Sequence, residues 1–165
     1  MGSAERISNA ARLVAQAAET CPVAVVASAM SGVTDMLLDT AQAALRGDAA
    51  QIEANIAALR TRHDEALAGL TDEGADTRAS LDALLDELAA IYGAIRFSGE
   101  VTPRLHDRMV SMGEKLSIRL LAAALTADGH DAVALDADTF LETDGVHRAA
   151  SPLGQVADRS IQGAL

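Results

Sequence analysis

The chain has 165 residues, with 13 lysines and arginines against 24 aspartates and glutamates, so its formal charge at pH 7 is −11. This length fits one domain, and an apolar share of 50% provides a core and excludes general disorder. The acidic balance argues against nucleic acid and anionic membrane surfaces, which both attract clustered Lys and Arg. The lone Cys21 excludes an internal disulfide, and no apolar run approaches the ~20 residues of a membrane span, so we expect a cytoplasmic protein.

Helical periodicity dominates the sequence. Thr102 and Pro103 have the residue types of an N-cap and of a first helical position, which predicts that a long helix begins there. Gly99 is expected to end the helix before it. Apolar spacing predicts helices over residues 4–19, about 37–45, about 48–98, 103–128 and 157–165. Within the stretch 48–98, a loop is expected at 69–76.

Two short apolar runs look like buried strands. Residues 23–27 are rich in valine and residues 132–135 are continuously apolar, which is typical of strands covered on both faces in a parallel sheet. A third, weaker strand is expected over 139–143. Strands joined through helices predict an α/β fold. Because a parallel sheet usually has about five strands, either the protein is mostly helical or part of the sheet is missing.

The segment 28–35, S-A-M-S-G-V-T-D, is the best candidate site. It joins the first predicted strand to a helix, where the hydroxyls of Ser28, Ser31 and Thr34 and the free N–H groups of the helix N-terminus favour a phosphate or carboxylate. The alternative is an ordinary turn in which Ser and Thr serve as caps. The segment is not a Walker A motif, because no G-K-[ST] follows.

Two further groups of polar residues are candidate binding sites. Glu114, beside Lys115 in S-M-G-E-K-L-S at 111–117, could hold a substrate ammonium, although an acid near a helix N-terminus that complements the dipole is the simpler reading. Acidic residues after the second predicted strand could bind Mg²⁺, but a solvated acidic loop is favoured; they are Asp136, Asp138, Glu142 and Asp144. The four histidines show no ligand spacing, so no metal site is predicted.

Three motifs in order identify a resemblance. They are V-V-A-S-A-M-S-G-V-T-D at 25–35, E-V-T-P-R at 100–104 with Asp107, and S-M-G-E-K-L-S at 111–117. The chain resembles the aspartate kinases (aspartokinases) of the amino-acid kinase family. The resemblance implies an α/β, three-layer sandwich with a partial, mostly parallel sheet. Residues 1–165 would form a partial kinase domain with a helical insertion over about 36–110.

The resemblance also implies an activity. Family members transfer a phosphoryl group from ATP, with Mg²⁺, to the side-chain carboxylate of L-aspartate, giving 4-phospho-L-aspartate for the synthesis of lysine, threonine and methionine. Thr34 and Ser28 would then contact aspartate, Glu114 would pair with its α-ammonium group, and the implied substrate-binding set is Ser28, Ser31, Gly32, Thr34 and Glu114.

Departures from the family pattern limit this expectation. The family's opening strand ending in K-F-G-G, with its lysine, and a later L-G-R-G-G-S-D segment have no counterpart here, so no catalytic residue is assigned. We expect the isolated chain to be inactive and to self-associate through exposed sheet edges. Two alternatives stay open: a helical binding or assembly module that reuses the fold, and another amino-acid kinase with a different carboxylate substrate.

Overall fold

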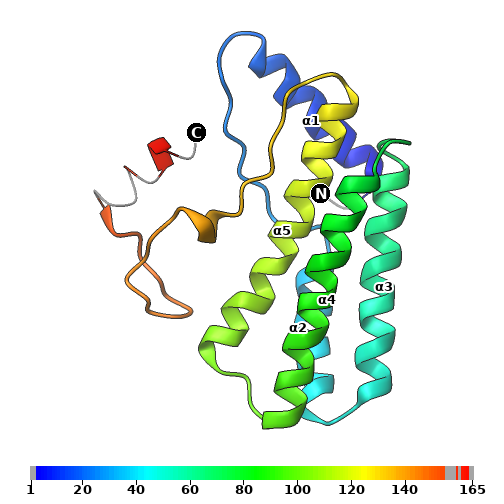
Figure 1. The fold of residues 1–165 in the computed structure, drawn as a ribbon, viewed down its shortest axis with the longest axis vertical. Helices are drawn as coiled ribbons and strands as arrows, with labels where there is room; N and C mark the ends of the chain where they lie inside the picture. Colours follow the sequence, from blue (N-terminus) through cyan, green and yellow to red (C-terminus); the bar gives the residue numbers. More distant parts are fainter. Residues whose placement is uncertain (1–2, 155–158, 160, 164–165) are drawn as a thin grey trace.

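The computed structural model describes residues 3–154, 159 and 161–163. The helices within these residues are α1 (Ala4–Ala18), α2 (Val33–Leu45), α3 (Ala49–Ala68), α4 (Ala75–Ser98), α5 (Pro103–Ala127) and the short 3₁₀ helix η1 (Ala137–Thr139). Helices α2 to α5 pack together as a bundle, and α1 lies across one end of it against α5 and α3 (Figure 1). Of the helix predicted over 157–165, residues 159 and 161–163 are described and are helical, and the others lie outside the described residues.

The predicted helix boundaries are confirmed by their caps. Thr102 is the N-cap of α5, where its hydroxyl accepts a hydrogen bond from the Leu105 N–H at 3.2 Å, and Pro103 follows at the first helical position. Gly99 ends α4 with φ +72°, a left-handed conformation that a side chain would strain. The expected insertion over 36–110 spans α2 to α4, and its far boundary falls inside α5.

The core of the bundle is aliphatic, with one tyrosine. Leu37 of α2, Leu88 of α4 and Leu116 of α5 are fully buried in it. Tyr92 of α4 is also fully buried, and its hydroxyl donates to the Leu37 carbonyl oxygen at 2.8 Å. Burial raises the pKa of Tyr92, so the phenol stays protonated and keeps this link between α4 and α2.

The α/β prediction is wrong for the described part of the chain. Its only β pairing is an isolated antiparallel bridge between Thr143 and Pro152. Residues 23–27 and 132–135 form neither helix nor sheet. The weak third strand predicted over 139–143 is replaced by η1 and the turn after it, except that Thr143 at its end forms the bridge to Pro152. The protein is therefore a helical bundle with two non-helical segments beside it, not a three-layer sandwich.

The two segments predicted as strands are covered on one side only. Along 131–136 the residues alternate between exposed and half-buried, so that Ala132 packs on the core while Val133 is 75% exposed. In the other segment Ala27 packs on the core while Val26 is fully exposed. A strand buried on both faces needs neighbouring strands and a second covering layer, whereas the described residues place helices against one face only. Because the described residues form no sheet, they offer no sheet edge for the expected self-association. Self-association itself stays a prediction, which light scattering across micromolar concentrations checks.

The segment after η1 is attached to the bundle through Asp107 of α5. Its carboxylate accepts a hydrogen bond from the Arg148 N–H at 2.8 Å and lies 3.2 Å from His147 Nδ1. The Arg148 N–H holds the pKa of Asp107 below its usual value, so this anchor is ionised at neutral pH. None of the helices in the described residues has the length and apolar character of a membrane span.

His63 is the one buried histidine of the described residues, on the core side of α3. Its Nδ1 lies 2.7 Å from the Leu59 carbonyl oxygen, which can only accept, so Nδ1 carries the proton in the neutral ring. Nε2 is buried without a partner. Burial lowers the pKa of His63, because protonation would create a buried charge and an unpaired N–H donor.

This histidine predicts a loss of stability in mild acid. The unfolded chain takes up a proton near the ordinary histidine pKa of 6.5, whereas the folded chain resists it to lower pH. The free energy of unfolding therefore falls as pH drops below 6.5, by at most about 1.4 kcal/mol per pH unit from this group, until the folded pKa is passed. The free energy of unfolding, measured with urea between pH 7.5 and 5, should decline less in His63→Leu than in the wild type. Parallel curves for wild type and His63→Leu would contradict the assignment.

Candidate functional site

Loop 28–32 and the start of α2 present free polar groups. Gly32 is the N-cap of α2 with φ +77° and provides no side-chain cap. Ser28 and Ser31 are exposed and Thr34 is half-buried. Within the described residues, the amide N–H groups of Thr34 and Asp35 have no hydrogen-bond partner, as expected in the first turn of a helix. The loop therefore offers hydroxyl and amide donors where a carboxylate or phosphate could bind.

Glu114 lies in a different setting from the one its sequence suggested. Helix α5 begins at Pro103, so Glu114 stands three turns inside the helix and does not complement the N-terminal dipole. Its side chain is half-buried and has no hydrogen bond or ion pair to any described residue. A partly buried carboxylate without a partner is suited to receive a cation such as an ammonium group.

The loop and the Glu114 turn are in contact. A Cβ built on Gly113 would lie 2.7 Å from the Ala29 Cβ and 3.5 Å from side-chain atoms of Val33 and Leu37. Only a glycine allows α5 to approach the loop this closely. The two motifs that the sequence singled out, separated by about eighty positions, thus pack against each other beside Ser28 and Glu114.

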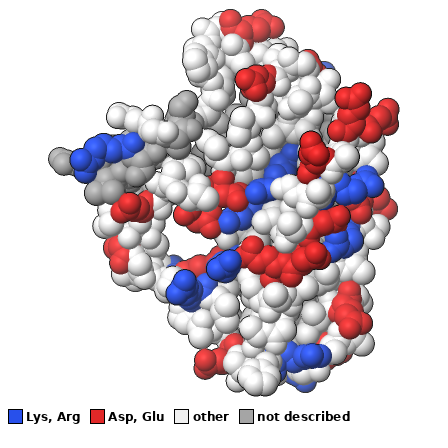
Figure 2. Space-filling model, in the orientation of Figure 1, with Lys and Arg blue, Asp and Glu red and all other residues white. Residues whose placement is uncertain are grey.

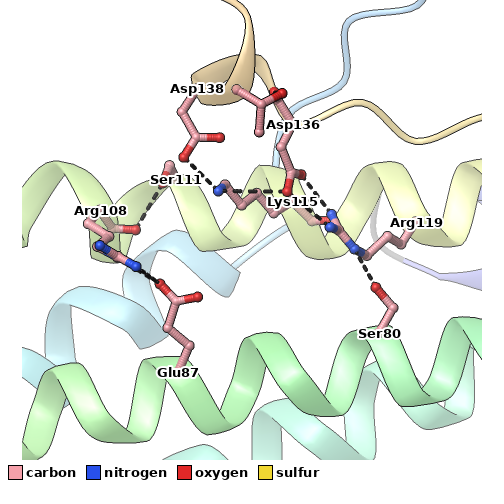
Figure 3. Close-up of polar contacts among 9 residues, drawn as sticks. Ser80, Glu87, Arg108, Ser111, Lys115, Arg119, Asp136 and Asp138 are labelled. Carbon is pink, nitrogen blue, oxygen red and sulfur yellow. Dashed lines mark hydrogen bonds and ion pairs between the residues drawn. The ribbon is translucent and has the colours of Figure 1, made fainter.

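An ionic cluster lies farther along α5 (Figure 3). Arg119 binds Asp136 with two hydrogen bonds, from Nη1 to Oδ1 at 2.8 Å and from Nη2 to Oδ2 at 3.0 Å, while its Nε donates to Ser80 of α4 at 2.7 Å. Lys115 Nζ binds Asp138 Oδ2 at 2.7 Å and approaches Asp136 at 3.8 Å. The Arg119 hydrogen bonds hold the pKa of Asp136 below its usual value. We call these four side chains, Lys115, Arg119, Asp136 and Asp138, the α5 clamp, because they fasten the segment 131–139 to α5.

The α5 clamp answers two questions that the sequence left open. Lys115, the single lysine of the chain, is held by Asp138, so it does not point a free ammonium group toward the loop. Asp136 and Asp138, considered as magnesium ligands, are paired with cations instead. Among the described residues, no group of three His, Cys, Asp or Glu side chains is placed to hold a metal ion, so these residues do not fit Mg²⁺.

Sequence reasoning missed the basic side chains around the site. Arg119 was not singled out, although Lys115 and Arg119 are four apart and must share a helix face. Arg6 and Arg62 were not predicted as site residues either. No local sequence pattern indicates them, because α1, α3 and loop 28–32 come together only in the folded chain. Figure 2 shows that basic side chains at the centre of one face lie next to acidic ones.

Comparison with known proteins gives consistent results. The model of the amino acid kinase family matches residues 1–159. Aspartokinase of Schizosaccharomyces pombe is 33% identical over 132 residues, covering 73% of this chain and 25% of the relative. Two Arabidopsis thaliana proteins are similar to 86% of the chain: a chloroplastic bifunctional aspartokinase/homoserine dehydrogenase 1, at 33% identity over 16% of its length, and chloroplastic aspartokinase 2, at 32% identity over 26%. The chain thus spans about a quarter or less of these relatives.

Proposed function

Because the chain belongs to the amino acid kinase family, we propose that it carries the aspartate-binding part of an aspartate kinase. The proposed reaction transfers the γ-phosphoryl group of ATP to the side-chain carboxylate of L-aspartate, giving 4-phospho-L-aspartate and ADP. The contact between Ala29 and Gly113 is the observation that supports this proposal, because it packs the loop that carries the hydroxyl and amide donors against the turn of α5 that carries Glu114. A zwitterionic amino acid needs both kinds of group.

The proposed roles follow from charge and hydrogen-bonding capacity. Glu114 pairs with the α-ammonium group of aspartate, the only positive charge that the substrate carries. Ser28, Thr34 and the free N–H groups of the first turn of α2 bind a carboxylate, with Ser31 and Gly32 shaping the loop. An aspartate side chain with a pKa of about 3.9 is already ionised at pH 7, so its oxygen attacks phosphorus without a general base, and catalysis rests on positioning.

ATP is the proposed phosphoryl donor on the evidence of the family and its named relatives. Mg²⁺ is expected with the nucleotide, but none of the roles above is assigned to it, since the described residues offer no fitting cluster. The cytoplasm stays the predicted compartment, in keeping with the single, free Cys21.

Ligand-induced stabilisation tests the proposal. L-Aspartate at millimolar concentration should raise the melting temperature, because it binds only the folded state. Glu114→Gln should weaken the apparent affinity about tenfold through loss of a charged hydrogen bond, and Thr34→Val should weaken it similarly. Glu53→Gln removes an exposed carboxylate from α3 and should behave as wild type. Succinate, which lacks the ammonium group, should bind Glu114→Gln at least as tightly as wild type, because the substitution removes a carboxylate that repels it.

The outcome also separates the alternatives. A larger shift with L-glutamate than with L-aspartate would assign the site to a kinase with another carboxylate substrate. No response to either amino acid would favour a helical binding or assembly module and contradict the proposal.

Turnover by the 165-residue chain alone is not expected. Lys115 is engaged with Asp138, and the described residues include no glycine-rich loop that could surround the phosphates of a nucleotide. Incubation with ATP, Mg²⁺, L-aspartate and hydroxylamine should therefore yield no aspartyl hydroxamate above a blank without protein. Sustained hydroxamate formation would show that this chain binds and positions ATP by itself.

A further inference from the structure

We propose that the hollow between α1, loop 28–32 and α3 binds a small oxyanion of the phosphate class through Arg6 and Arg62. The hollow has a volume of about 280 Å³ and is lined by Ser3, Arg6, Ser31 and Arg62. Each lining side chain can donate a hydrogen bond, and two of the four are cationic. No carboxylate lines the hollow, so no described residue neutralises these charges there.

Close packing fixes the walls of the hollow. A Cβ built on Gly69, at the end of α3, would lie 2.7 Å from the Ala4 Cβ, so the first turn of α1 rests directly on α3. Seven residues before Gly69, Arg62 Nη2 donates to the Ser31 carbonyl oxygen at 2.7 Å. Arg62 thereby joins α3 to loop 28–32, and the hollow is a built feature of three segments.

The Arg62 guanidinium has unused donors. Of its five N–H groups, one binds Ser31, and its Nε is buried without a partner. Arg60, two residues earlier on α3, instead pairs with both Asp82 and Asp86 of α4. In a chain with 24 acidic residues, the absence of a carboxylate beside Arg62 in the described structure leaves its charge available to a ligand.

Ser3 and Arg6 complete the donor set from α1. The Ser3 hydroxyl accepts from the Arg6 N–H at 3.4 Å, which leaves its own hydrogen free to donate. The Arg6 guanidinium is exposed and has no ion pair within the part of the chain described. Two cations lining one hollow repel each other, and an anion between them removes that repulsion.

Size and charge define the ligand class. The volume is below the range of about 300–1,000 Å³ that is typical of pockets for drug-sized ligands, yet a water molecule occupies only about 30 Å³. There is thus room for one phosphate ion with some of its hydration, or for a single phosphoryl group of a larger molecule. Two guanidinium groups match the two negative charges and the several acceptor oxygens of such a group.

Thermal unfolding with inorganic phosphate, against chloride at equal ionic strength, tests the site. Phosphate should raise the melting temperature of the wild-type chain. Arg62→Gln and Arg6→Gln should each weaken the apparent phosphate affinity about tenfold. Arg12→Gln removes the same charge from an exposed position on α1 outside the hollow and should bind as wild type. Glycerol 3-phosphate in a parallel titration distinguishes a free phosphate from a phosphomonoester.

Several results would overturn the proposal: equal shifts with phosphate and chloride, unchanged phosphate affinity in Arg6→Gln, or weakening in Arg12→Gln as large as in Arg6→Gln. If Arg62→Gln fails to fold, the exposed Arg6→Gln decides alone. The site is independent of the aspartate proposal, because Glu114→Gln should keep the phosphate response and Arg6→Gln should keep the aspartate response. If the arginine variants lose aspartate binding but retain phosphate binding, the hollow belongs to the amino-acid site instead.

Discussion

Gly113→Ala should destabilise the protein by about 1–2 kcal/mol, although alanine is the better helix former. In the interior of α5 the substitution gains about 0.5–1 kcal/mol of helix propensity. The added methyl group, however, would lie 2.7 Å from the Ala29 Cβ. That atom is fixed to the backbone of loop 28–32 and cannot rotate away, so the loop must shift, and forcing a methyl group into close packing costs about 1–3 kcal/mol.

The matched control is Gly93→Ala in α4. Gly93 is also inside a helix, but it is exposed and a Cβ there meets no atom within 4 Å. This variant should be stabilised by about 0.5–1 kcal/mol. The free energy of unfolding, measured with urea, should therefore be lower than the wild-type value for Gly113→Ala and higher for Gly93→Ala. Movement in the same direction would show that the loop does not pack against Gly113.

The double variant Ala29→Gly with Gly113→Ala separates the clash from any other effect. Removing the Ala29 methyl group makes room for the new one, so the pair should be more stable than the two single changes predict together. Simple additivity of the two free energies would count against the contact. A weaker L-aspartate response in Gly113→Ala that is restored in the double variant would link the contact to the proposed site.

Asp136→Asn should destabilise the chain by about 2 kcal/mol, because it removes a charge-assisted, two-bond partner of Arg119. Both side chains are less than one fifth exposed, so water replaces the lost bonds poorly. The loss should be concentrated in the segment 131–139, whose amide hydrogens should exchange faster while those of the helical bundle stay protected. Unaltered exchange in that segment would contradict the role of the α5 clamp.

Asp138→Asn is the control for this prediction. Its carboxylate is 62% exposed and pairs with Lys115, so its loss should cost less than about 1 kcal/mol. The pH dependence gives an independent check on Asp136. The pKa of Asp136 is held below the ordinary 3.8. The ionised side chain therefore contributes fully to the free energy of unfolding above pH 3.8, and this contribution is lost only as the pH falls through the pKa of the folded state. The free energy of unfolding of the wild type should therefore stay above that of Asp136→Asn down to about pH 4.

The helices could be predicted because their signals are local. Thr102 and Pro103 mark the start of α5, Gly99 marks the end of α4, and both predictions are confirmed. Each signal acts within one or two turns of the residue that gives it, so neighbouring sequence is sufficient. The apolar spacing that predicted α4 and α5 is the spacing of side chains that lie in the core, such as Leu88 and Leu116.

The strands could not be predicted for the opposite reason. The valines of residues 23–27 and the continuous apolar run of residues 132–135 favour an extended chain, but a strand exists only where another strand pairs with its backbone. No described segment does so, and Val26 and Val133 remain exposed. The sequence pattern indicated an extended chain in these segments and could not predict whether another strand would pair with it.

The candidate site falls between these cases. Residues 28–34 and Glu114 were chosen on their motifs, and the contact between Ala29 and Gly113 brings the two motifs together. The substrate roles of these residues remain proposals. The ion pairs of Lys115 and the hollow at Arg62 are formed by segments far apart in the sequence, so residue spacing does not predict them.

The buried tyrosine has a practical consequence. The chain has no tryptophan, and Tyr92 is its single tyrosine, so near-ultraviolet fluorescence excited at the phenol band comes from one place in the molecule. That place is the junction of α4 and α2, where the hydroxyl donates to the Leu37 carbonyl oxygen. The tyrosine fluorescence of the native protein therefore reports on this one position, and Tyr92→Phe is the control variant that lacks the signal.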